Sequence, residues 1–166
     1  MNAYSKISTN PREALRDYLA KVRAGMLGVR GSEQHMQPMT HYPDWDQDRI
    51  WFLTSRQTDL VRSLTPGAPA EFCVTDEGHG FDASLRGLLT EDLNREKLDE
   101  YWSSVAAAWF KGGKEDPDLT MLRLDLTDAA LWGSSNSLIK FGVEILKANL
   151  NEEETPDLGV HRVVTF

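Results

Sequence analysis

Residues 48–64 place hydroxyl, guanidinium and backbone amide groups in an order that can hold an anion. A β-branched and aromatic run at 50–53 predicts a strand, and apolar residues at helical spacing after Thr58 predict a helix. The first N–H groups of a helix lack internal partners and carry the positive end of its dipole. Thr54, Ser55 and Thr58 add hydroxyls, and Arg56 adds a fixed charge suited to a phosphate. The same pattern also fits a simple strand-to-helix corner in which Thr58 only caps the helix.

Other reactive patterns are missing from the sequence. It has no Gly-x-Ser-x-Gly elbow, no lysine-bearing phosphate loop and no His-Glu-x-x-His. Asp44, Asp46 and Asp48 alternate as in a calcium loop, but Arg49 stands where that loop needs glycine. We interpret this segment as a solvated hairpin tip and predict no metal site. Any reactive chemistry is then expected to come from a cofactor.

Composition limits the classes of protein that the chain can represent. The 166 residues are 40% hydrophobic and 27% charged, which predicts one globular domain over 1–166, with a core at about 11–150 and an acidic tail after 150. A formal net charge of −8 argues against general binding to nucleic acid or anionic membrane. The single cysteine, Cys73, excludes an internal disulfide. With no apolar signal segment or membrane-length run, we expect a cytoplasmic protein.

The elements that must position these groups follow from periodicity. The pattern predicts helices at 11–25, with Asn10 as cap and Gly25 at the end, at 94–110, and from the serines after 134 to about 150. It predicts strands at 26–29, 35–42, 70–76, 81–90 and 119–126. Because the strands come mostly as hairpins, we predict an α+β fold, a small antiparallel barrel with peripheral helices.

Five segments carry a resemblance to a known family: 25–27, 37–39, 51–56, 108–113 with the Asp-Pro-Asp that follows it, and 131–132. The pattern resembles the pyridoxamine phosphate oxidase-like flavoproteins, and most closely their general stress protein branch, over residues 15–150. The Trp-Phe-x-Gly-Gly segment is the most specific of these motifs.

The resemblance implies an antiparallel split β-barrel of Greek-key type that forms a homodimer with FMN at the interface, and with FAD as the alternative flavin. It implies that the flavin phosphate lies on the corner described above and the ring along residues 37–40, with two tryptophans closing the pocket, one or both from the partner chain. The implied flavin-binding residues are Gln37, Pro38, Met39, Thr40, Phe52, Leu53, Thr54, Ser55, Arg56, Thr58, Asp59, Trp109 and Trp132.

Two positions depart from the family pattern. The family usually carries arginine at the position of Gln37 and commonly lysine at that of Leu60. A lost charged hydrogen bond weakens binding by about 1.5–3 kcal/mol, so we expect weaker FMN binding, binding shared with FAD, or no binding. Restoring lysine at position 60 is expected to tighten FMN.

The resemblance implies a flavin-dependent oxidoreductase that transfers hydride or electrons, with NADH or NADPH as the candidate reductant. It does not imply a true pyridoxamine phosphate oxidase, and no residue is assigned as catalytic. One alternative is a non-catalytic dimer that stores or senses flavin. Another is a related barrel for haem or deazaflavin, because His35 and His41 would share one face of the strand predicted at 35–42.

Overall fold

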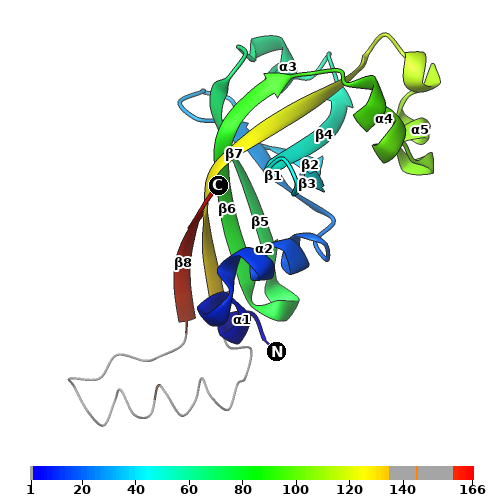
Figure 1. The fold of residues 1–166 in the computed structure, drawn as a ribbon. Helices are drawn as coiled ribbons and strands as arrows, with labels where there is room; N and C mark the ends of the chain where they lie inside the picture. Colours follow the sequence, from blue (N-terminus) through cyan, green and yellow to red (C-terminus); the bar gives the residue numbers. More distant parts are fainter. Residues whose placement is uncertain (1, 135–144, 146–158) are drawn as a thin grey trace. The chain divides into compact units, whose positions relative to one another are not determined.

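The computed structural model describes residues 2–134, 145 and 159–166 of the chain (Figure 1). The chain divides into two compact units. The first unit comprises Met1–Val22, Val74–Ser84 and Ala129–Thr165, and the second unit comprises Arg23–Cys73, Leu85–Asp128 and Phe166. Three long strands have residues in both units: β5 (Ala68–Asp76), β6 (Phe81–Glu91) and β7 (Leu119–Ser134). That the chain forms a single domain stays a prediction.

An antiparallel sheet is the main feature of the fold. Seven of its eight strands follow the order β2-β1-β5-β6-β7-β4-β3, and the eighth, β8 (Gly159–Thr165), pairs with β7. The remaining strands are β1 (Ala24–Val29), β2 (Gln37–Thr40), β3 (Tyr42–Asp44) and β4 (Arg49–Ser55). Pairings of β1 with β2 and β5, and of β4 with β3 and β7, are all antiparallel. The predicted class, an α+β split barrel, is confirmed.

In the first unit, the predicted cap at Asn10 is confirmed. The Asn10 side chain accepts from the Glu13 amide at 3.3 Å, which caps the helix, and donates to the Glu13 carboxylate at 2.8 Å. Helix α2 (Pro11–Leu19) starts there, and the sequence analysis did not foresee the preceding helix α1 (Ala3–Thr9). Strand β8 at the end of the chain was not predicted either.

The predicted helix end at Gly25 is wrong, because α2 ends at Leu19 and Gly25 lies in β1. A Cβ at position 25 would lie 2.4 Å from the carbonyl oxygen of Cys73 on the neighbouring strand. Close approach of two strands therefore requires this glycine. At the β5–β6 hairpin, Gly80 has a φ of 64°, the left-handed conformation that the predicted turn needs.

The second unit has an aromatic and aliphatic core. Ile50 and Phe52 of β4 and Phe72 of β5 are fully buried, and the Phe52 and Phe72 rings meet edge to face at 5.1 Å. Trp51 of β4 and Met121 of β7 belong to a further cluster of buried residues. Partly buried residues from the helices that follow β6 pack on this cluster, which fixes those helices against β4 and β7.

The helix predicted at 94–110 is interrupted. It forms α4 (Arg95–Tyr101) and α5 (Ser104–Trp109), because Trp102 is extended and Ser103 caps the second helix by accepting from the Ala106 amide at 3.3 Å. The strand predicted at 35–42 is likewise split into β2 and β3, with His41 between them. β7 continues eight residues beyond the strand predicted at 119–126, and its last residue is Ser134.

The last predicted helix lies outside the described residues apart from Ile145, and so do residues 151–158 of the predicted acidic tail, whereas β8 lies beyond them. None of the helices that the structure does describe is long and apolar enough to cross a membrane.

Candidate functional site

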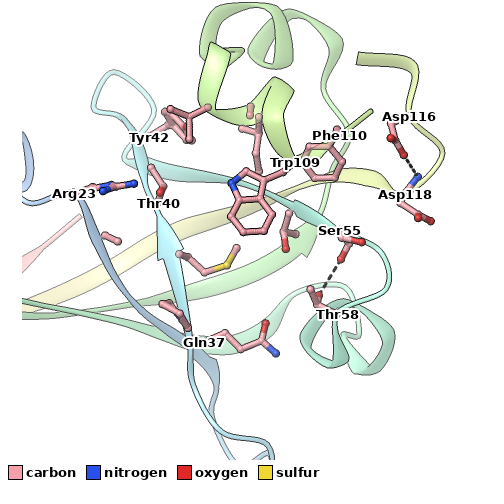
Figure 2. Close-up of a pocket in the computed structure, with 17 residues that line it drawn as sticks. Arg23, Gln37, Thr40, Tyr42, Ser55, Thr58, Trp109, Phe110, Asp116 and Asp118 are labelled. Atoms are coloured by element: carbon pink, nitrogen blue, oxygen red, sulfur yellow. Dashed lines mark hydrogen bonds between the residues drawn. The ribbon is translucent and has the colours of Figure 1, made fainter. Parts of the chain in front are cut away.

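A cavity of about 890 Å³ lies in the second unit, between β2, β4 and α5 (Figure 2). This volume is within the range of about 300–1,000 Å³ that small-molecule and cofactor sites occupy. Nine of the thirteen residues predicted from the sequence line it: Gln37, Pro38, Met39, Thr40, Leu53, Thr54, Ser55, Thr58 and Trp109. The fold thus brings together β2 and the end of β4, two segments that the family resemblance had assigned to the same ligand.

Strand β2 forms one wall of the cavity. It lies at the end of the strand order and pairs with β1, so that Thr40 is opposite Ala24 and Pro38 is opposite Met26. Met39 is buried, whereas Gln37 is half-buried and Thr40 exposed. The wall therefore combines a thioether, an amide and a hydroxyl, which can contact an apolar ring and hydrogen-bond its edge.

The corner after β4 is organised by its own hydroxyls. Thr58 donates to the Ser55 carbonyl at 3.0 Å and accepts from the Val61 amide at 3.4 Å, so it caps α3 (Asp59–Ser63). Ser55 accepts from the Gln57 amide at 3.1 Å. The simpler of the two interpretations of this corner, a helix cap at Thr58, is therefore confirmed as a structural role.

Thr54 differs from these two residues. Its side chain lines the cavity and the residue is only 8% exposed, yet its hydroxyl has no hydrogen-bond partner among the described residues. The hydroxyl is therefore free to bond a ligand in the cavity. A ligand with a donor or acceptor near Thr54 would provide its partner.

Three residues predicted for the site have other surroundings within the second unit. Phe52 is fully buried in the core, and Asp59 is an exposed first residue of α3. Arg56 donates to the Glu91 carboxylate at 3.1 Å and to the Pro117 carbonyl at 3.0 Å. None of the three lines the cavity.

The two predicted tryptophans have different environments. Trp109 of α5 borders the cavity although 80% of it is exposed, and Val105, one turn earlier, is 60% exposed. Trp132 belongs to the first unit, where its ring stacks on His161 with centroids 5.1 Å apart. Helix α5 thus presents an apolar face toward the cavity opening.

Eight lining residues were not among the predicted ones: Arg23, Ala24, Tyr42, Val105, Ala106, Phe110, Asp116 and Asp118. A signal existed for three of them, since Phe110, Asp116 and Asp118 belong to the motif that carried the family resemblance. Tyr42 follows Thr40 by two residues, and that spacing is the strand period. Nothing in the sequence marked Arg23, because strand pairing alone brings it to the cavity.

Two carboxylates stand at the end of the cavity near Ser55 and Thr58. The Asp116 carboxylate accepts from the amides of Gly112 at 2.9 Å and Asp118 at 3.0 Å. These two backbone donors lower the pKa of Asp116. Asp118 accepts from the Gln57 side chain at 2.9 Å. Negative charge is therefore fixed close to the corner that was predicted to hold a phosphate.

His35 and His41 do not share a face. His35 is exposed in the loop before β2, whereas His41 is buried, with its ring 5.3 Å from that of Phe72. Neither histidine lines the cavity. The expectation that they stand together on one strand is wrong, because the strand begins only at Gln37.

Comparison with known proteins identifies the family. The sequence model of the pyridoxamine 5'-phosphate oxidase like family matches residues 10–157, and the chain belongs to this family. The general stress protein branch expected from the sequence is confirmed by the solved structures that resemble the chain. The comparison with curated proteins found no match.

Three solved structures illustrate the similarity. A protein from Jannaschia sp. CCS1 described as general stress protein 26 is 42% identical, with 90% of this chain and 94% of that chain covered and a TM-score of 0.72. The general stress FMN/FAD binding protein from Xanthomonas citri is 38% identical over 71% of this chain and 84% of that one, with a TM-score of 0.65. A general stress family protein from Xanthomonas campestris pv. campestris is 36% identical over 78% and 93%, with a TM-score of 0.69.

Proposed function

We propose that the protein binds a flavin, FMN or FAD, in the cavity of the second unit. The observation that carries the proposal is the convergence of β2, the β4 corner and α5 on one cavity of about 890 Å³, in which the Thr54 hydroxyl has no partner among the described residues. The Xanthomonas citri relative, described as an FMN/FAD binding protein, adds support from outside this chain.

The lining residues fit the ring of a flavin. Met39, Leu53, Val105 and Trp109 supply apolar surface for a flat heterocycle. Gln37 and Thr40 supply an amide and a hydroxyl that can hydrogen-bond the polar edge of such a ring. These six residues come from β2, β4 and α5, so the ring would be held between two strands and a helix.

The phosphate end fits through hydroxyls rather than through charge. The hydroxyls of Thr54 and Ser55 can still donate at the cavity wall, whereas that of Thr58 caps α3 and the guanidinium of Arg56 is paired with Glu91. Asp116 and Asp118 add negative charge nearby. We therefore propose that the protein binds FMN less tightly than a cavity with a free arginine at this corner would, which agrees with the expectation from Gln37 and Leu60.

When bound, a flavin supplies hydride and single-electron transfer. The residues of this chain would orient the ring, exclude water from its β2 side and expose the opposite side to a second reactant. We propose an oxidoreductase role with NADH or NADPH as reductant, and assign no residue as general acid or base. The second candidate is a flavin-storing or flavin-sensing protein, which the same cavity would serve without turnover.

Exposed apolar residues of α5 support a dimer. Val105 and Trp109 border the cavity and remain 60% and 80% exposed, whereas most large apolar side chains are buried. We propose that a second copy of the chain covers this face and closes the flavin site. Light scattering of the purified protein tests this point, since a monomeric mass at micromolar concentration would contradict it.

A fluorescence titration tests flavin binding. FMN should quench tryptophan emission, because Trp109 borders the proposed ring site. Trp109→Phe should remove most of this quenching, whereas Trp45→Phe serves as the matched control, because Trp45 does not line the cavity. Lack of quenching and of any change in flavin absorbance at micromolar protein would refute the proposal. Steady-state reduction of bound flavin by NADH or NADPH then separates the enzyme from the non-catalytic binder.

A further inference from the structure

We propose that the Arg23 end of the cavity is an anion subsite, which holds the carboxylate or phosphate group of a second, planar small molecule. That this molecule binds in addition to a flavin rests on the proposed function. The subsite itself follows from Arg23 and Tyr42, two lining residues that the flavin argument does not use.

Arg23 lines the cavity without an ion pair or hydrogen bond of its side chain to any described residue. Other arginines of the second unit are engaged: Arg49 with Asp125 at 2.6 Å, Arg86 with Asp128 at 2.7 Å and Arg95 with Glu115 at 2.9 Å. The charge of Arg23 is therefore not offset by a neighbour. A guanidinium at a cavity wall is suited to the two oxygens of a carboxylate or phosphate.

Charge is distributed unevenly along the cavity. Figure 2 shows Arg23 on the same side as Thr40 and Tyr42, with Asp116 and Asp118 on the far side and Trp109 between them. Because the two carboxylates repel anions and the arginine attracts them, a ligand that lies beside the flavin would direct its negative group toward Arg23.

Neighbouring groups complete the subsite. Thr40 pairs with Ala24, the residue after Arg23, in the β1–β2 register, so its hydroxyl stands beside the arginine's strand. The Tyr42 ring stacks on Tyr101 with centroids 4.9 Å apart, which holds it in place. Burial raises the pKa of Tyr42, so its phenol stays protonated and neutral at physiological pH. Neither residue adds a negative charge that would oppose an anion.

The apolar wall defines the shape of the ligand. Val105 and Trp109 offer exposed apolar surface beside the cavity, which favours a flat ring over a flexible polar chain. Benzoate and benzamide form a matched pair of probes, because both are planar and nearly equal in size, and only benzoate carries a charge.

Isothermal titration of both probes into the full chain, with and without saturating FMN, tests the proposal. We expect benzoate to bind more tightly than benzamide, and Arg23→Gln to weaken benzoate by about tenfold while leaving benzamide unchanged. Arg23→Lys should retain part of the preference. Arg30→Gln is the matched control, since Arg30 is an exposed arginine just past the other end of β1 and does not line the cavity.

The outcomes separate this proposal from flavin binding. Equal affinities for benzoate and benzamide, or a benzoate affinity that Arg23→Gln leaves unchanged, would overturn the subsite whether or not FMN binds. If FMN displaces benzoate competitively, the Arg23 end takes the flavin's own anionic group, and the claim of a second ligand is overturned. If FMN does not bind, the flavin proposal fails, and the flavin-free titration still decides the role of Arg23. Phenyl phosphate in place of benzoate distinguishes a phosphate ligand from a carboxylate.

Discussion

Arg56 and Glu91 form an ion pair, with Nε of Arg56 3.1 Å from Oε1 of Glu91. The same carboxylate oxygen accepts a hydrogen bond from Thr120 at 2.7 Å, and a second guanidinium nitrogen donates to the Pro117 carbonyl at 3.0 Å. The cation nearest the predicted phosphate corner is thus held by a carboxylate of β6. Its attraction for a ligand phosphate is reduced by the partner that holds it.

This pair leads to a prediction with two opposite changes. Glu91→Gln keeps an acceptor for Thr120 but removes the negative charge, so FMN should bind several-fold more tightly. Arg56→Glu places two carboxylates together and should weaken FMN by about tenfold or more.

Riboflavin, which lacks the phosphate, is the control ligand for both variants, and fluorescence titration measures all affinities. Its affinity should hardly change in either variant. If FMN and riboflavin lose affinity equally, the ring pocket has been damaged instead. If neither variant changes FMN binding, the phosphate lies away from this corner.

Thr54 and Thr58 carry the same side chain in different surroundings, so one substitution made at both positions separates ligand binding from helix capping. Thr54→Val replaces a hydroxyl that has no partner among the described residues, so stability should hardly change. Flavin affinity should fall, because the ligand loses its partner. Thr58→Val removes the cap of α3 and should lower the free energy of unfolding by about 1 kcal/mol.

Urea unfolding and FMN titration of both variants check this prediction. Thr54→Val should lower the affinity for FMN, whereas Thr58→Val should chiefly lower the free energy of unfolding. A Thr54→Val protein that binds FMN as the wild type does would remove Thr54 from the site.

Leu60 changes the outcome expected for a restored lysine. The residue is 3% exposed in α3, so a lysine there must bury its stem and either bury or neutralise its ammonium group. Leu60→Lys should therefore destabilise the protein by about 3 kcal/mol or more instead of simply tightening FMN. Leu60→Met keeps the volume and should cost less than about 1.5 kcal/mol.

Chemical unfolding of the two variants provides the measurement. If Leu60→Lys unfolds like the wild type and also binds FMN more tightly, the lysine reaches the ligand, and the interpretation of position 60 as a core position is wrong.

Asp116 leads to a prediction about pH. Backbone amides of Gly112 and Asp118 donate to its carboxylate and lower its pKa below 3.8. For a depressed pKa, the stabilising effect is present above the unfolded value and is lost as pH falls through the lower folded value. Near neutral pH the loop at 112–118 should therefore be insensitive to pH.

A carbon-detected NMR titration of the Asp116 carboxyl group tests this prediction. The midpoint should lie below 3.8 in the folded protein. Asp116→Asn should abolish this titration and shift the Gly112 amide resonance, because one of the two backbone hydrogen bonds loses its acceptor. A midpoint at or above the ordinary value would show that the backbone bonds do not form in solution.

The sequence by itself determined the local features of the protein. Asn10 and Thr58 could be assigned as caps because a cap depends on residues within three positions along the chain. The strand at 119–126 and the hairpin at Gly80 are equally local. Motifs of the family added β2, the β4 corner and Trp109 to one site, and the structure brings these segments to one cavity.

Only the tertiary structure decided which charges reach the cavity. Arg56 had looked available, but β6 brings Glu91 to it from 35 residues away. Arg23 had no local signal and lines the cavity only because β1 pairs with β2. Leu60 is a core residue for the same kind of reason, since its burial depends on elements distant in sequence. Periodicity records which side of an element is apolar, whereas the partner of a charge depends on strand pairing, which no short window of sequence contains.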